Sequence, residues 1–338
     1  MTEPTTHSST NPNPMIAFNF GEPEPIESAQ WLTDYTELFY DHFGDYWSTP
    51  ISRQGLAQIA NTNAHHGALI YARRNMVAGR FKGGGGMQRV QMQAFVHNLI
   101  QFGDAAFLKV RNGLGRVVRL HPLPSIYLRR HSSGDFILLQ ANNEQIRYRQ
   151  ADVIYLTQYD PRQQIYGLPD YLGGIQSALL NRDATMFRRR YYQNGAHMGF
   201  IFYATDPNLS ETQEEDLKAK IQSSKGVGNF RSLFINIPNG NPDGVKLIPV
   251  GDIATKDDFD RIKNISAQDV LTAHRFPPGL AGIIPTNAGG LGDPEKTDAV
   301  YARNEVVPLC ELIADVVNSD SDIPSHLALQ FDLPVTTV

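Results

Sequence analysis

The feature that most constrains the fold is a pair of long helix-forming segments with a β-rich stretch between them. Residues 171–195 carry two adjacent apolar stripes at helical spacing, so this helix is expected to pack against more than one neighbour. Residues 255–278 form a second helix, which ends where two prolines follow Phe276. Between them, residues 196–254 show the pattern of one strand, a capped polar helix and two further strands. This order predicts a small βαββ module inserted between two long helices.

The second of these helices has two candidate starts. Thr255 and Ser266 are each followed three residues later by an acidic residue, which is the capping-box signature. We therefore expect the helix to break or kink near Ile265. The stretch 279–294 that follows is rich in Gly, Pro and Asn and carries one charge, Asp293. A long, nearly uncharged loop between helices is uncommon in a compact domain and is usually functional.

The flanking regions combine helical and strand patterns, which predicts an α+β fold class. Residues 1–15 are Pro-rich and polar, and we expect a disordered tail there. Helices are expected at residues 28–43, 54–75, 88–102 and 295–317, and strands at 106–110, 116–120, 127–130, 136–139, 153–156 and 327–333.

Charge is distributed unevenly along the chain. The formal net charge is −5, from 30 basic and 35 acidic side chains. Residues 1–50 carry eight acids and no base (−8), residues 51–150 carry fourteen bases and three acids (+11), and residues 151–338 are again at −8. The total argues against a protein that binds nucleic acid through a broadly basic surface.

Cysteine content and hydropathy limit the class of protein further. The single cysteine, Cys310, excludes an intramolecular disulfide and a cysteine zinc site, and its apolar surroundings predict a buried small side chain. No run of about 18 apolar residues is present, and the N-terminus lacks the basic and apolar regions of a signal peptide. We expect a protein of a reducing compartment that does not span a membrane.

The sequence offers no positive sign of an enzyme. Lys296-Thr297 follows Glu295 instead of the glycine that a P-loop needs, and the run Gly83–Gly86 lacks the P-loop lysine. His65 and His66 are adjacent, so on a helix they point about 100° apart and cannot chelate one ion as an i, i+4 pair would. No catalytic residue, metal site or cofactor is predicted.

The run Arg188, Arg189 and Arg190 permits two interpretations. Cations in the last turns of a helix interact favourably with the helix dipole, by about 0.3–1 kcal/mol each. Alternatively, the arginines fan out around the helix, so that one of them contacts a phosphate or a partner protein.

The order of elements and several motifs resemble the portal proteins of tailed bacteriophages, PBSX type. The resemblance covers about residues 16–318, with the four-glycine run as a local departure from a more apolar loop. The matching motifs are FNFGEPEP at 18–25, AHH at 64–66, IYGLPDYL at 165–172, FRRRYYQNGAH at 187–197, GNFRSLF at 228–234, the stretch 238–249, DVLTAHRFPPGLAG at 269–282, GGLGD at 289–293 and RNE at 303–305.

The resemblance implies a dodecameric ring at one vertex of a phage capsid. Double-stranded DNA would pass through its channel during packaging by a terminase and during ejection, and the tail or neck would dock on it. The implied regions are a wing (16–170, with 295–338 returning to it), two stem helices (171–195 and 255–278), a clip (196–254) and a tunnel loop (279–294).

The resemblance also names candidate residues and partners. The expected partners are the terminase large subunit, capsid and scaffold proteins, and a tail or neck completion protein, in the virion and, during assembly, in the host cytoplasm. The candidates are Ile284, Pro285, Thr286, Asn287, Gly289 and Gly290 in the tunnel loop, Arg188, Arg189, Arg190, Lys256, Arg261 and Lys263 for stem or partner contacts, and Asn229, Phe230 and Arg231 in the clip.

Two other classes of protein stay open at this point. One is a metal-dependent DNA-processing enzyme that uses Asp104 with His65 or His66 near the basic segment 51–150. The other is a monomeric adaptor that binds a single protein partner.

Overall fold

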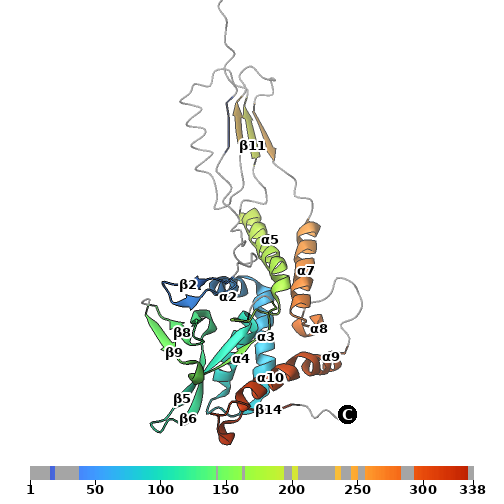
Figure 1. Ribbon diagram of the computed structural model, residues 1–338. Coiled ribbons are helices and arrows are strands. Elements are labelled where there is room, and N and C mark those ends of the chain that lie inside the picture. Colours follow the sequence, from blue (N-terminus) through green and yellow to red (C-terminus); the bar gives the residue numbers. More distant parts are fainter. Residues whose placement is uncertain are drawn as a thin grey trace, which may run out of the picture. The chain divides into compact units, whose positions relative to one another are not determined.

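The computed structural model describes residues 16–19, 38–141, 144–161, 164–193, 200–204, 233–236, 245–249, 256–282 and 293–333. The chain divides into two compact units (Figure 1). Unit 1 comprises Met1–Glu27 and Asp183–Ile262, and unit 2 comprises Ser28–Arg182 and Lys263–Val338. The long helices α5 (Ile175–Gln193) and α7 (Lys256–Ala273) contribute residues to both. No helix in the described ranges is both long and apolar enough to cross a membrane.

Unit 1 contains a four-stranded mixed sheet in the order β1-β12-β11-β13. Its strands are β1 (Ile16–Asn19), β11 (Phe200–Ala204), β12 (Leu233–Asn236) and β13 (Val245–Pro249). The three strands expected within 196–254 are therefore present, whereas β1 was not predicted. The expected disordered tail and the polar helix of this module lie outside the described residues.

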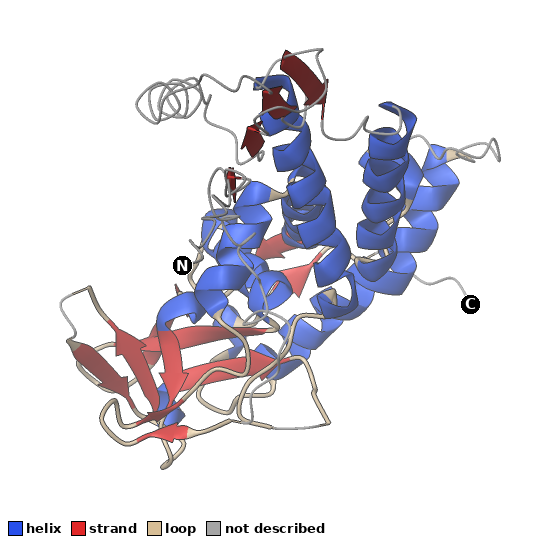
Figure 2. Ribbon diagram, turned by 90° about the horizontal axis from the view of Figure 1, so that it is seen from above, coloured by secondary structure: helices blue, strands red, loops and turns tan. Residues whose placement is uncertain are grey.

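Unit 2 places two three-stranded antiparallel sheets at one side and most of its helices at the other (Figures 1 and 2). The first sheet has the order β10-β5-β6 and the second the order β7-β8-β9. The helices are α2 (Arg53–Thr62), α3 (Ala64–Gly79), α4 (Arg89–Phe102), α8 (Pro278–Ala281), α9 (Pro294–Tyr301) and α10 (Val307–Asn318), with a π-helical turn at Ala302–Val306 and short 3₁₀ turns at Ser125–Tyr127, Gln150–Asp152, Leu172–Gly174 and Ser325–Leu327. The strands of these sheets are β5 (Asp104–Arg111), β6 (Val117–Leu123), β7 (Leu128–Arg130), β8 (Phe136–Leu139), β9 (Gln145–Tyr148) and β10 (Val153–Thr157). Two further antiparallel pairs are β2 (Tyr40–Asp41) with β3 (Tyr46–Trp47), and β4 (Phe81–Gly83) with β14 (Gln330–Phe331).

Helix α4 lies at the centre of the main core. Its Phe95 ring stacks on Phe107 of β5 with centroids 3.8 Å apart, and Met92 is fully buried. The C-terminal helix α10 contributes Ile313 and Cys310, both with no exposed surface. The predicted burial of Cys310 is therefore confirmed.

The expected helix 28–43 is wrong over the part that the structure describes. Residues 40–47 form the β2–β3 pair, with a tight turn at 42–45. Asp45 takes a positive φ of 60°, which interrupts a helix, and Gly44 packs where a Cβ would lie 2.4 Å from the Tyr46 ring. Residues 38–43 therefore do not continue a helix.

The expected helix 54–75 is two helices, separated at Asn63. The Asn63 backbone is extended, and its side chain caps α3 by accepting a hydrogen bond from the His66 N–H at 2.8 Å. Its amide nitrogen also donates to the Ala178 carbonyl of α5 at 2.7 Å. Because Asn63 both caps α3 and binds the backbone of α5, it fixes the start of α3 against α5.

The four-glycine run forms a bridge between the β6 edge and the C-terminal segment. Gly84, Gly85 and Gly86 all take positive φ. The Gly85 N–H donates to the Leu327 carbonyl at 2.7 Å, and its carbonyl accepts from the Leu120 N–H at 2.8 Å. A Cβ at Gly84 would lie 2.2 Å from the Ala328 carbonyl oxygen, so this position requires glycine.

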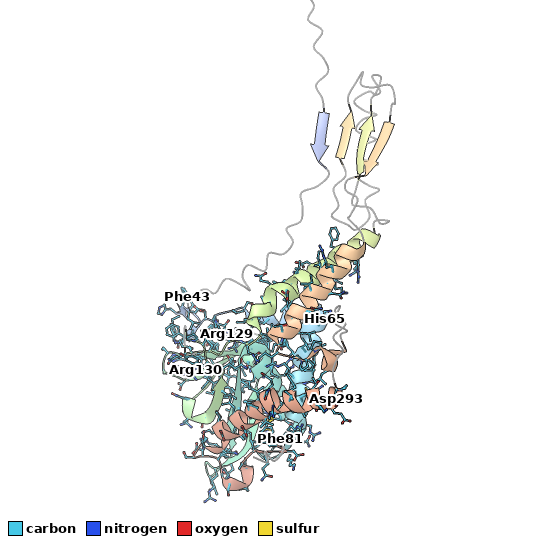
Figure 3. The ribbon with its side chains drawn as sticks, turned by 90° about the vertical axis from the view of Figure 1, so that its right-hand side faces the viewer. Phe43, His65, Phe81, Arg129, Arg130 and Asp293 are labelled. Atoms are coloured by element: carbon cyan, nitrogen blue, oxygen red, sulfur yellow. The ribbon has the colours of Figure 1, made fainter. Side chains whose placement is uncertain are left out.

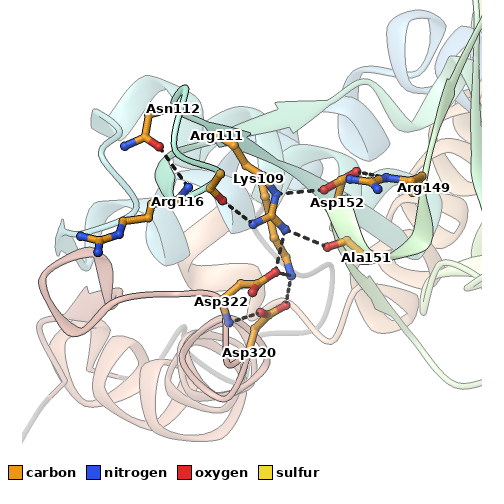
Figure 4. Close-up of polar contacts among 10 residues, drawn as sticks. Lys109, Arg111, Asn112, Arg116, Arg149, Ala151, Asp152, Asp320 and Asp322 are labelled. Carbon is orange, nitrogen blue, oxygen red and sulfur yellow. Dashed lines mark hydrogen bonds and ion pairs between the residues drawn. The ribbon is translucent and has the colours of Figure 1, made fainter.

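A charged cluster joins the segment after α10 to the sheet (Figure 4). The buried ammonium of Lys109 lies 2.6 Å from Asp320 and 3.2 Å from Asp322. Arg111 contacts Asp322 at 2.7 Å and Asp152 of the neighbouring 3₁₀ turn at 3.0 Å. Hydrogen bonds from Arg111 and Lys109 lower the pKa of the Asp322 carboxyl, so Asp322 stays ionised at neutral pH.

Candidate functional site: the junction at the base of α5 and α7

Helices α5 and α7 meet through small and polar residues in unit 2. Asn181 Nδ2 donates to Ser266 Oγ at 2.9 Å and to the Lys263 carbonyl at 3.0 Å, and Ser177 Oγ donates to Asp269 at 3.0 Å. A Cβ at Gly174 would lie 2.4 Å from the Ala273 Cβ, so the backbones approach closely at this end. These contacts pair the two helices in antiparallel orientation.

Helix α7 runs without interruption from Lys256 to Ala273, so the expected break near Ile265 does not occur. Ser266, the candidate second cap, is buried inside the helix. Its hydroxyl donates to the Lys263 carbonyl at 3.2 Å and accepts from Asn181. The residue that suggested a helix start therefore makes a helix–helix contact.

Next to this helix pair, the carboxylate of Asp170 accepts hydrogen bonds from two arginines. Arg73 of α3 donates to it through Nη1 at 2.9 Å and Nη2 at 2.6 Å, and Arg275 donates through Nη2. Arg275 also pairs with Glu305 of the π-helical turn at 2.9 Å. Burial acts to raise the pKa of Asp170, but the two arginines outweigh it and lower that pKa.

Arg275 occupies an unusual backbone position. It follows the last turn of α7 with a φ of 52°, in the left-handed region where glycine is the usual residue. The Phe276 N–H donates to the Leu271 carbonyl and the Arg275 N–H to that of Thr272, both at 2.9 Å, which is the Schellman pattern of a helix C-terminus. The strained backbone thus turns the guanidinium toward Asp170 and Glu305.

Two neutral histidines complete the junction. Arg73 can only donate, so His274 Nδ1, 3.3 Å from its Nη1, is the acceptor and the His274 proton lies on Nε2. That proton is donated to His66 Nδ1 at 2.9 Å. Burial lowers the pKa of His66 to about 4, and burial with the charge of Arg73 nearby lowers that of His274. The Tyr171 ring stacks on His274 and donates its hydroxyl to the Gln101 carbonyl at 2.6 Å.

We call Arg73, Asp170, Arg275, Glu305 and the histidines His66 and His274 the junction. It joins α3, the start of α5, the end of α7 and the helix that leads into α10. None of its ion pairs was predicted, because each joins residues far apart in sequence. The sequence signal that could have pointed to these ion pairs is the presence of charged residues within the motifs at 165–172, 269–282 and 303–305.

The predicted stem residues lie along α5 and α7. Arg188, Arg189 and Arg190 fall in the last two turns of α5, with Arg188 half-buried and Arg189 exposed. On α7, Lys256 is the first residue, Arg261 is exposed and Lys263 is half-buried. The tunnel-loop candidates Ile284, Pro285, Thr286, Asn287, Gly289 and Gly290 and the clip candidates Asn229, Phe230 and Arg231 lie outside the described residues.

The residues proposed for a metal-dependent enzyme are not brought together. Asp104 is fully buried and is hydrogen-bonded by the buried guanidinium of Arg53, whereas His66 pairs with His274. Burial raises the pKa of Asp104 against the opposing charge of Arg53. Within the part of the chain that the structure describes, no group of His, Cys, Asp and Glu is arranged to hold a metal ion.

Comparison with known proteins points to one family. The sequence profile described as "Phage portal protein" matches residues 87–334. The "Probable portal protein" of Haemophilus phage HP1 is 55% identical over 310 residues, covering 90% of each chain. That of Escherichia phage P2 is 39% identical over 316 residues, covering 93% of this chain and 91% of the relative.

Solved structures share the fold. A chain in the neck of a native gene transfer agent particle, computed with C12 symmetry, matches with a TM-score of 0.60 and 15% identity, over 92% of this chain and 91% of that one. An HK97 family portal protein from Corynebacterium diphtheriae matches with a TM-score of 0.53 and 17% identity, over 81% and 93%. Taken with the family profile and the two phage relatives, these matches show that the chain belongs to the phage portal proteins, structural proteins of the virion that form the connector at the capsid vertex.

Proposed function

We propose that copies of this chain form a closed ring of twelve subunits, and that double-stranded DNA passes through its channel during packaging and ejection. The observation that carries the proposal is the antiparallel pair α5 and α7, which flank β11, β12 and β13 along the chain, because this order matches a stem and a clip. The related neck structure with C12 symmetry supports the subunit number. The motif pattern supports the PBSX type.

We assign the regions of the chain as the sequence predicts them. Residues 16–170 form the wing, to which 295–338 return, residues 171–195 and 255–278 form the stem, residues 196–254 form the clip, and residues 279–294 form the tunnel loop. Strand β1 at 16–19 is the exception within the first of these ranges, because it pairs with β12 in the sheet of the clip strands. The loop faces the DNA in this proposal. Its single charge at Asp293 suits a surface along which DNA must slide, because each strong phosphate contact adds affinity through counterion release.

The ring also determines how partners bind. A closed ring uses a heterologous interface, in which two different faces of each subunit are complementary. The stem cations Arg188, Arg189, Arg190, Lys256, Arg261 and Lys263 are the proposed partner contacts. The proposed partners are the terminase large subunit, capsid and scaffold proteins, and the neck completion protein, with assembly in the host cytoplasm.

The assembly state of the purified full-length chain tests this proposal. Light scattering coupled to size-exclusion chromatography is expected to report a species of about twelve subunits, and negative-stain images should show rings with a central channel. A chain that stays monomeric over the accessible concentration range, in low and physiological salt, would contradict the proposal and favour an adaptor.

A further inference from the structure

Helix α10 exposes two carboxylates on the side that points away from the core. Its buried residues face the main core and are Cys310, Ile313 and Val317. Glu311 and Asp315 lie one turn apart on the other side of the helix and are exposed. Like charges at this spacing repel each other. Helix α10 carries no lysine or arginine, and within the described ranges neither carboxylate has an ion pair, so both charges are available to a partner.

The end of the β5–β6 hairpin carries the opposite charge. Residues 112–121 include two arginines, Arg116 and Arg119, and no acidic residue. Both arginines are exposed, and among the residues that the structure describes neither guanidinium has an ion pair or a hydrogen bond. Leu114, 83% exposed, and Val118, 46% exposed, lie in the same segment. The hairpin end therefore combines cations with exposed aliphatic side chains.

The acidic residues beside this hairpin are already paired. Arg111 contacts Asp152 at 3.0 Å and Asp322 at 2.7 Å. Asp322 also lies 3.2 Å from the Lys109 ammonium. These carboxylates balance the cations of β5, so they do not neutralise the two arginines further along the hairpin.

The two charged surfaces belong to different faces of the β10-β5-β6 sheet. In the β5–β6 register Arg119 lies opposite Val110, the residue after Lys109. Because successive residues of a strand point to opposite faces, Arg119 and Lys109 project from different faces. Phe107 shares the face of Lys109 and belongs to the same core cluster as the buried residues of α10. Helix α10 therefore covers one face of the sheet, and Arg119 lies on the other.

The second sheet of unit 2 marks the Arg119 face. Leu128 of β7 shares a core cluster with Ala106 of β5, which projects from that face. In Figure 3, Arg129 and Arg130 of β7 lie on one side of unit 2, and Asp293, the residue before α9, lies on the other. Complementary surfaces on opposite sides of one subunit pair head to tail, which is the arrangement that closes a ring.

We propose that the outer side of α10 in one copy packs against the end of the β5–β6 hairpin in the neighbouring copy. The carboxylates of Glu311 and Asp315 face the guanidiniums of Arg116 and Arg119, and exposed aliphatic side chains add apolar contact. The occupant is a second copy of this chain, because the two surfaces are opposite in charge, unpaired within the subunit and directed to opposite sides. This inference rests on the proposed ring and specifies one of its contacts.

Charge reversal in the full-length chain tests the contact. An acid-reversal variant carries Glu311→Arg and Asp315→Arg. A base-reversal variant carries Arg116→Glu and Arg119→Glu. Each variant alone presents like charges at every contact, so the concentration at which its ring dissociates in low salt is expected to rise by at least about tenfold. Glu144→Arg, at an exposed acid between β8 and β9, is the matched control and should leave that concentration unchanged.

A mixture of the two reversal variants provides the decisive measurement. Copies of the two variants can alternate around a ring of twelve and bring opposite charges together at every contact, so the equimolar mixture is expected to restore rings. A variant that fails to fold would not be rescued in this way. Circular dichroism of each variant alone checks that its fold is retained.

The outcomes separate this inference from the ring itself. Wild-type rings with an unchanged dissociation concentration in both reversal variants would overturn the contact and leave the ring intact. Weakened assembly without rescue in the mixture would also overturn it. A base-reversal variant that keeps its rings but loses affinity for a double-stranded DNA oligonucleotide would assign the arginines to DNA instead. A wild-type chain that forms no ring would contradict the ring and this contact together.

Discussion

Acidification should loosen unit 2 through its buried histidine pair. A histidine with a lowered pKa in the folded state makes folding less favourable as the pH falls, because the unfolded chain takes up a proton that the folded chain refuses. His66 has a folded pKa of about 4, against about 6.5 in an unfolded chain. The linkage relation then gives a loss of about 2 kcal/mol in unfolding free energy between pH 7 and pH 5 from His66 alone. His274 adds to the loss in the same direction.

Urea unfolding at the two pH values, followed by tryptophan fluorescence, measures this loss. Trp47 lies on β3 in unit 2, so its fluorescence reports on the unit that holds the histidines. His66→Gln retains an acceptor for the His274 N–H but does not titrate, and it should reduce the pH-dependent loss by about 2 kcal/mol. His326→Gln, at an exposed histidine, is the matched control. The same unfolding free energy at pH 5 and pH 7, or a full loss in His66→Gln, would refute the reasoning.

Three further substitutions test contacts in unit 2 by urea unfolding. Gly84→Ala should lower the free energy of unfolding by about 1–3 kcal/mol, because the alanine would need a positive φ and its Cβ would clash with the Ala328 backbone. Gly79→Ala, with open space around it, should raise that free energy by up to about 1 kcal/mol. Asp170→Asn should lower the free energy of unfolding by about 3–5 kcal/mol, because it leaves a buried guanidinium without its carboxylate. The matched surface change Asp332→Asn should have little effect, because this ion pair is exposed. Lys109→Met should cost about 1.5–3 kcal/mol and speed amide hydrogen exchange in residues 320–323, whereas unchanged exchange there would contradict the role of this cluster.

The regular elements could be predicted because their signals are local. Strand β13 is one of the two strands expected after the polar helix within 196–254, and α4 begins one residue after its expected start and ends where expected. Strands β5 and β6 correspond to the strands expected at 106–110 and 116–120, and they pair as an antiparallel hairpin. In each case side-chain spacing and turn chemistry within a few residues are sufficient.

The junction could not be predicted, because its residues act on partners far away in sequence. Arg73, Asp170 and Arg275 are each unremarkable in their local context, and only the fold brings them within hydrogen-bonding distance. The prediction of a second helix start at Ser266 was wrong for the same reason. Its pattern is that of a cap, but the partner that decides its role, Asn181, lies on another helix.

The pairing of β1 with β12 has a consequence for the order in which the chain is built. Ile16 pairs with Asn236, so β1 leaves the ribosome about 220 residues before its partner strand is synthesised. Until then β1 exposes unpaired backbone, which is the condition under which nascent chains associate with one another. A start site moved downstream of β1 would leave β12 as a permanent edge of this sheet, so the N-terminal residues protect unit 1 against aggregation as well as completing its sheet.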